Sequence, residues 1–228
     1  DPALSVGTFR TTLSHQVRGS LVQLILCLLC IVLGLFYMFF AYIIYSEIPE
    51  QKQMFYLGAF SLSIGIWCLC DMPLTSLLFP NFAVGLYLLA MLGLMLAPAL
   101  FSRLLYWMPT MEARLYGVIG ILTGLWNLML ILLQLLNLVD LRNALYADFL
   151  SLLLPLILVF LLGMRNLITR KQTREMIPLD CVYICFVLAV GADLCLYFSL
   201  GSSNYPKLLS FVSVVHLLVM SIVRSEER

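Results

Sequence analysis

Polar side chains that could bind a ligand or carry a proton lie inside long apolar stretches of this chain. Two carboxylates, two amides and one imidazole are the candidates for ligand binding or signal sensing: Asp71, Asn127, Gln134, Asp193 and His216. Each costs free energy in hydrocarbon, so each is expected to face other protein groups and to mark a functional position. A carboxylate that faces an imidazole offsets two desolvation costs at once and is suited to ligand binding or proton sensing.

The depths of Asp193 and His216 predict that they meet. At 1.5 Å per helical residue, Asp193 lies about 10 Å below the outer end of its segment and His216 about 12 Å below the outer start of the next. Asp71 and Gln134 are expected to complete a polar cluster in the outer half of a bundle. A purely structural contact, a ligand or proton-sensing site, and no contact at all are the three alternatives for the pair.

A stripe of small and polar residues runs along segment 115–138 at helical spacing. It comprises Tyr116, Gly120, Thr123, Asn127 and Gln134, and Gly120 with Gly124 forms a GxxxG pair. Such a stripe packs against neighbouring helices, with the amides hydrogen-bonded across the interface. Packing without a ligand and a ligand-facing surface are both compatible with it.

The elements that hold these residues belong to a membrane protein. Hydrophobic residues make up 63% of the 228 residues, charged residues 11%, and the mean hydropathy is +1.04, whereas soluble chains average about 45–50% apolar and 25% charged. The lipid bilayer is therefore the expected partner. The net charge of +1 argues against nucleic acid, which needs a basic face.

Seven segments are apolar over the roughly 20 residues that a helix needs to cross a bilayer. Their ranges are 21–45, 53–76, 82–105, 115–138, 146–167, 179–200 and 208–223. A membrane β-barrel would instead show alternating strands of about ten residues. The predicted fold is an all-α integral membrane bundle of seven transmembrane helices. Pro98 and Pro155 interrupt two of them, as hinges or as static bends.

Lysine and arginine set the orientation, because cytoplasmic segments retain positive charge. One side of the bundle collects nine of these residues: Lys52, Arg103, Arg114, Arg165, Arg170, Lys171, Arg174, Arg224 and Arg228. The other side has four: Arg10, Arg18, Arg142 and Lys207. We therefore expect the N-terminus outside and the C-terminus in the cytoplasm, in a multi-pass protein of the inner (plasma) membrane.

Three regions follow from this arrangement. Residues 1–20 are expected to form an extracytoplasmic juxtamembrane segment, 21–223 the transmembrane sensor domain, and 224–228 the start of a cytoplasmic signalling helix. The first 20 residues lack the apolar run of a signal peptide, and we expect the chain to be a domain of a longer protein.

Enzyme chemistry is not expected within this chain. The sequence shows no catalytic nucleophile with a base, nucleotide loop, metal constellation or cofactor motif. The seven cysteines fall inside predicted spans, where they are expected to serve as packing residues. The only lysine near the last span, Lys207, sits at its edge and not at the depth that a retinal Schiff base requires.

Two segments resemble a known family. Tyr56, Leu57 and Gly58, followed by the run from Gly65 to Asp71, resemble the "LYLG...GLWSLCE" stretch of bacterial membrane sensors that precede GGDEF domains. Asn127 and the run from Leu133 to Asp140 resemble their "N...LQLLGI.D" run. Asn137 replaces a frequent Gly, and Asp71 a frequent Glu. The chain is thus similar to the seven-transmembrane receptors with diverse intracellular signalling modules.

The resemblance implies a homodimeric sensor whose last span drives a fused cytoplasmic output module, often a diguanylate cyclase. A small-molecule ligand in the bundle or an upstream detector domain would supply the signal. The alternative is a small-solute or proton-coupled transporter that uses the buried Asp and His residues.

Overall fold

Every element in the described part of the chain is a helix. The computed structural model describes residues 2–43, 49–107, 113–136, 138, 141–169, 181 and 184–192. The elements are α1 (Pro2–Ile43), α2 (Pro49–Cys70), α3 (Pro73–Leu78), the short 3-10 helix η1 (Pro80–Phe82), α4 (Ala83–Tyr106), α5 (Ala113–Leu135) and α6 (Leu141–Thr169). Residues 184–192 are also helical.

Four of these helices are long and apolar enough to cross a membrane. The segments are Leu21–Ile43, Gln51–Cys70, Pro80–Tyr106 and Arg114–Gln134, and α6 adds a shorter apolar segment, Ser151–Leu162. The prediction of an all-helical membrane protein is thereby confirmed. Of the predicted span 179–200, residues 181 and 184–192 are described, and the predicted span 208–223 lies outside the described residues.

One predicted boundary is wrong. The second predicted span, 53–76, ends early, because α2 stops at Cys70 and a new helix, α3, begins at Pro73. Proline has no N–H to continue a helical ladder but fits the first turn of a new helix. At the other end of the chain, the predicted start of the first span agrees with the apolar segment Leu21–Ile43, and helix α1 extends beyond that segment to Pro2. A search for apolar length does not detect a polar helical extension.

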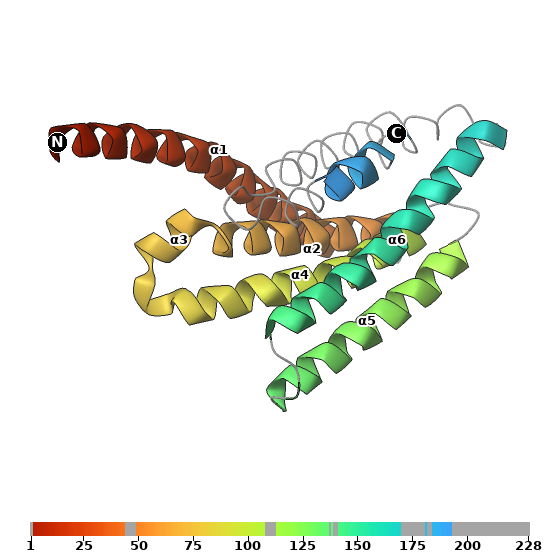
Figure 1. Ribbon diagram of the computed structural model, residues 1–228. Helices are drawn as coiled ribbons and strands as arrows, with labels where there is room; N and C mark the ends of the chain where they lie inside the picture. Colours follow the sequence, from red (N-terminus) through yellow and green to blue (C-terminus); the bar gives the residue numbers. More distant parts are fainter. Residues whose placement is uncertain are drawn as a thin grey trace.

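The helices pack in a row, with one helix laid across it. The chain places α1 against α2, α2 against α4, and α4 against α5, while α6 contacts both α4 and α5 (Figure 1). Glycines allow the closest approaches. A Cβ on Gly58 would lie 2.6 Å from the carbonyl oxygen of Gly34, and a Cβ on Gly93 would lie 2.8 Å from that of Ser63. Small residues at such contacts are the usual means by which membrane helices pack backbone to backbone.

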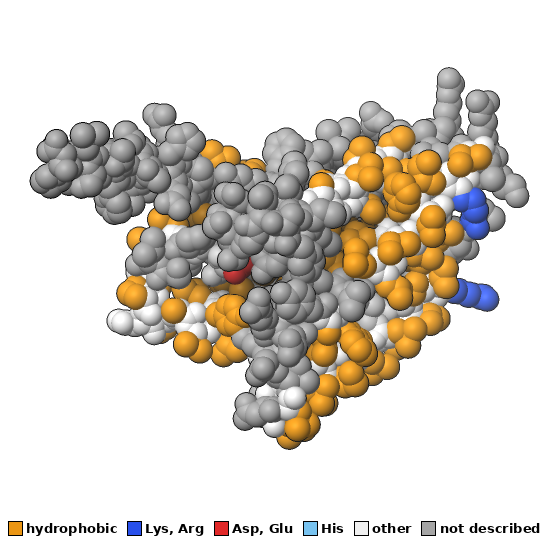
Figure 2. Space-filling model, in the orientation of Figure 1, with side chains coloured by type: hydrophobic (Ala, Val, Ile, Leu, Met, Phe, Trp, Pro, Cys, Tyr) orange, Lys and Arg blue, Asp and Glu red, His pale blue; other side chains and the backbone are white. Residues whose placement is uncertain are grey.

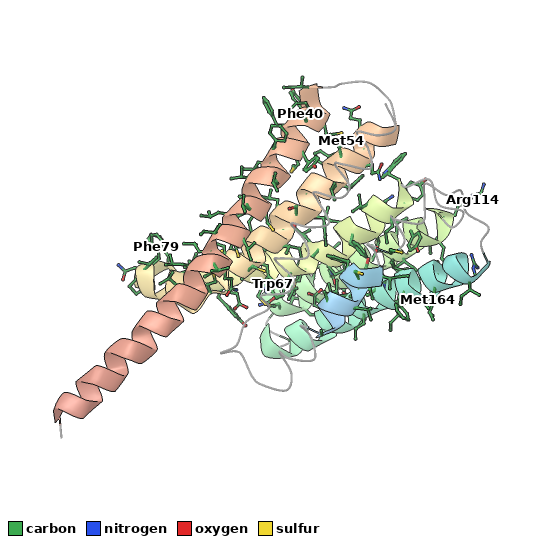
Figure 3. All side chains as sticks on the ribbon, turned by 90° about the horizontal axis from the view of Figure 1, so that it is seen from above. Phe40, Met54, Trp67, Phe79, Arg114 and Met164 are labelled. Atoms are coloured by element: carbon green, nitrogen blue, oxygen red, sulfur yellow. The ribbon has the colours of Figure 1, made fainter. Side chains whose placement is uncertain are left out.

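The ends of α1, α2 and α4 meet on one side of the bundle. Gln51 Nε2 donates to the carbonyl oxygen of Ala41 over 2.5 Å, and Lys52 Nζ lies 4.4 Å from the centroid of the Trp107 ring. Figure 3 shows Phe40 and Met54 at this end and Phe79 at the opposite end of α2. The connected helices are therefore antiparallel, as the short connections predict.

Aromatic rings fill the centre of the core. The ring centroids of Phe60 on α2 and Phe101 on α4 are 5.3 Å apart, and Phe186, in segment 184–192, lies 6.0 Å from Phe60 and 5.5 Å from Phe101. On the outside, Figure 2 shows mainly hydrophobic side chains over α5 and α6, and the Lys and Arg side chains that it colours lie at the right-hand end of these helices. An apolar exterior of this kind suits contact with lipid.

Candidate functional site: a polar cluster between α4, α5 and α6

The predicted polar stripe of α5 faces its neighbouring helices. Tyr116, Gly120, Thr123 and Asn127 are all buried, while Ile121, Leu122 and Leu125 on the other face are exposed. A Cβ on Gly120 would lie 3.1 Å from the Cβ of Ser102 on α4. The GxxxG segment therefore packs against α4, as the sequence predicts.

Asn127 joins α5 to α4 through a backbone carbonyl. Its Nδ2 donates to the carbonyl oxygen of Met95. That bond fixes the orientation of the amide, because a carbonyl oxygen only accepts. Asn127 Oδ1 therefore points away from Met95, toward α6.

On α6, Ser151 and Asp148 complete the cluster. Ser151 Oγ lies 3.3 Å from Asn127 Oδ1, 3.3 Å from Asp148 Oδ1 and 2.8 Å from the carbonyl oxygen of Asp148. Asp148 is 0% exposed, and its second oxygen, Oδ2, has no hydrogen-bond partner in the described structure. Trp126 adds a second link from α5 to α6, since its Nε1 donates to the carbonyl oxygen of Ala147 over 3.3 Å.

The two prolines lie next to this cluster. Pro98 is inside α4 and Pro155 inside α6, and each removes the backbone donor that would serve the carbonyl four residues earlier. Those carbonyls belong to Leu94 and Ser151. The first adjoins the Met95 carbonyl that Asn127 binds, and the second belongs to the serine that links α5 to α6. The cluster thus lies where the hydrogen-bond ladders of both helices are incomplete.

Three buried hydroxyls elsewhere in the described part of the bundle donate to main-chain carbonyl oxygens, two within their own helix and one, from Ser61, to the neighbouring helix α1. Ser102 Oγ donates to the carbonyl oxygen of Pro98 over 2.8 Å, Thr123 Oγ1 to that of Ile119 over 2.9 Å, and Ser61 Oγ to that of Cys30 over 2.9 Å. These hydroxyls are each satisfied by one main-chain acceptor. The α4–α5–α6 cluster differs, because it joins three helices and includes an acid.

Comparison with known proteins found no match for this chain. Neither the protein-family models, nor the curated proteins, nor the solved structures with which the chain was compared match it. The cluster must therefore be interpreted from its own geometry.

Of the three predicted site residues that the structure describes, Asn127 lies in the cluster and the other two lie outside it. Gln134 is half-buried further along α5, and its side chain makes no hydrogen bond to another described residue. Asp71 lies in the turn after α2, and α4 stands between α2 and α5. Asp193 and His216 lie outside the described residues, so their predicted pairing stays a prediction.

The sequence analysis missed Asp148 and Ser151. Both lie within the predicted span 146–167, and they are three residues apart, so they share one helical face. An acid inside an apolar segment was the available signal, because such a residue is expensive in lipid unless it has a role. The serine alone carried no signal, since hydroxyls in membrane helices usually bond to their own backbone.

Proposed function

We propose that this chain is the sensor domain of a membrane receptor, which passes a signal to a cytoplasmic output module. The observation that carries the proposal is the Asn127–Ser151–Asp148 cluster, because it connects three helices where two of them have incomplete backbone hydrogen bonding. An element with two arrangements of similar free energy is what a signal needs to shift. Exchange of polar partners in this cluster would supply the two arrangements.

The full proposal includes the topology. Seven spans cross the inner (plasma) membrane, with the N-terminus outside and the C-terminus in the cytoplasm, and two copies associate as a homodimer. A small-molecule or other cue alters the bundle, and segment 208–223 transmits the change to the output. The resemblance to receptors with diverse intracellular modules favours a GGDEF diguanylate cyclase as that output.

The first test is the coding sequence that follows residue 228. A diguanylate cyclase, kinase or phosphatase domain there supports the sensor proposal, whereas a stop codon contradicts it. Where the output is a diguanylate cyclase, Asn127→Leu in the full-length protein should change cellular cyclic di-GMP at unchanged membrane abundance. Gln134→Leu, which removes an amide from the same helix outside the cluster, is the matched control.

A second candidate function is cation- or proton-coupled transport of a small solute. Asp148 favours it, since a fully buried carboxylate in a membrane bundle is typical of transport pathways as well as of sensors. Uptake by proteoliposomes that depends on an ion gradient, and is lost in Asp148→Asn, would support transport. Output activity without uptake would support sensing.

A further inference from the structure

The cluster holds more acceptor atoms than its hydrogens can satisfy. Ser151 Oγ is within hydrogen-bond distance of three oxygens: Asn127 Oδ1, Asp148 Oδ1 and the carbonyl oxygen of Asp148. A hydroxyl has one hydrogen and donates to one acceptor at a time. The shortest distance, 2.8 Å, is to the carbonyl oxygen, which is the common local bond of a helical serine.

When the Ser151 hydroxyl donates to that carbonyl oxygen, three side-chain oxygens of the cluster accept no hydrogen bond. They are Asn127 Oδ1 and both carboxylate oxygens of Asp148, of which Oδ2 has no partner in the described structure. The amide hydrogens of Asn127 lie on the other side of its side chain, where Nδ2 donates to Met95. Buried acceptors without donors cost free energy, and a buried negative charge costs more.

A single bound proton corrects only part of this deficit. Protonation would neutralise Asp148 but would supply one hydrogen, so at least one of the three oxygens would still lack a donor. A metal cation removes the charge and serves several oxygens at once. The oxygen donors present, a carboxylate, an amide carbonyl and a hydroxyl, are those that hard cations prefer.

We propose that Asp148, Asn127 and Ser151 form a binding site for a monovalent hard cation, with Na⁺ as the probe. This deepens the proposed function, because it names a ligand for the same cluster. One carboxylate balances one positive charge, so the occupied site is neutral within the membrane. In the described part of the chain, no group of three or more His, Cys, Asp or Glu side chains is placed to hold a metal ion, which disfavours a divalent ion.

The spacing of the oxygens fits such an ion. Ligand oxygens at about 2.4 Å from a cation in roughly octahedral geometry lie about 3.4 Å from one another. Ser151 Oγ is 3.3 Å from both Asn127 Oδ1 and Asp148 Oδ1. Pro155 has no N–H to donate to the carbonyl oxygen of Ser151, four residues earlier. That oxygen is therefore a further potential ligand from the same residue. Cation binding therefore draws α5 and α6 together through side chains that otherwise repel.

The experiment measures Na⁺ binding through the stability of the purified full chain in nanodiscs. Tm is recorded by tryptophan fluorescence while NaCl is replaced stepwise by choline chloride at constant ionic strength. Tm should rise with Na⁺ and saturate, by about 5 °C or more at a hundredfold excess over Kd. Asp148→Asn should fold and lose the Na⁺ dependence, because its amide supplies hydrogens in place of the ion. Ser151→Ala should raise Kd about tenfold, whereas Ser151→Thr keeps the hydroxyl and should bind.

Asp71→Asn is the matched control, since it removes an acid outside the cluster and should leave the Na⁺ dependence unchanged. A wild-type Tm that is the same in NaCl and in choline chloride overturns the proposal. A wild-type Tm that changes with pH but not with Na⁺ also overturns it, because a proton then occupies the site. A Na⁺ dependence retained in Asp148→Asn overturns it too. If that variant does not fold, direct binding of radioactive sodium to wild type and to Ser151→Ala decides. Absence of Na⁺ binding leaves the sensor proposal standing, because that proposal is tested by output activity.

Discussion

The hydroxyl oxygen of Ser151 on α6 lies 3.3 Å from Oδ1 of Asn127 on α5, and this contact is the side-chain link between the two helices within the cluster. Because Asn127 also donates to the Met95 carbonyl on α4, one amide connects three helices. Interhelical polar contacts of this kind in membrane proteins contribute about 0.6–2 kcal/mol. The same amide is therefore both a stabilising contact and a point at which the three helices can be coupled.

Replacement of Asn127 by Leu should lower the free energy of unfolding by about 1–2 kcal/mol, because the hydrogen bond to the Met95 carbonyl and the polar contact with Ser151 are both lost. The measurement is unfolding in mixed micelles with a denaturing detergent, followed by circular dichroism. Gln134→Leu is the control on the same helix, and it should change stability by less than about 0.5 kcal/mol. Equal effects of the two substitutions would show that the bonds of Asn127 contribute nothing measurable.

Close packing of α1 against α2 predicts a sharp difference between two glycines. Gly58→Ala should destabilise the bundle by about 1–3 kcal/mol, because its Cβ would lie 2.6 Å from the carbonyl oxygen of Gly34. Gly85→Ala is the control, since a Cβ there meets nothing within 4 Å, and alanine favours helix over glycine by up to about 1 kcal/mol. Thermal unfolding of both variants checks this. A Gly58→Ala protein as stable as Gly85→Ala would contradict the observed helix contact.

Much of this fold could be predicted from sequence because the bilayer imposes a length on apolar segments. The spans around α4 and α5 agree with the structure to within a few residues, since charged residues, turn residues and prolines border both. The break at Asp71 was missed because the apolar run continues through Pro73 into α3, so hydropathy has no signal there. The proline itself was the signal, since it favours a helix start over a helix interior.

Only part of the candidate site could be predicted, because a pattern within one segment shows a helix face but not which other helix it meets. Asn127 was found because its helix presents a periodic stripe, which a single segment displays. Asp148 and Ser151 matter because of their distance from Asn127, and that distance depends on how α6 crosses α4 and α5. The crossing geometry of two helices is decided by how the side chains of both helices pack. It therefore cannot be predicted from the sequence of one segment alone.

The aromatic centre of the core predicts coupling between α2 and α4. The Phe60 and Phe101 rings are 5.3 Å apart, so a double-mutant cycle with Leu at each position should give an interaction energy of about 0.5–1.5 kcal/mol. The readout is the free energy of unfolding of the two single variants and the double variant. Additive effects would show that the rings stabilise the bundle independently.

The proposed orientation predicts which loops an impermeant thiol reagent reaches. Arg165 precedes the predicted loop 169–177 and Arg170, Lys171 and Arg174 lie within it, and positive charge is retained on the cytoplasmic side. Thr173→Cys should therefore label only after the cells are permeabilised, whereas Asn81→Cys, at an exposed position in η1, should label in intact cells. Native cysteines 27, 30, 68 and 70 are buried, and the wild-type protein gives the background of the remaining thiols. The proposed topology places the two sites on opposite sides of the membrane, so they must respond oppositely. Labelling of Thr173→Cys from outside, together with protection of Asn81→Cys, would reverse the orientation and place the C-terminal output on the wrong side of the membrane.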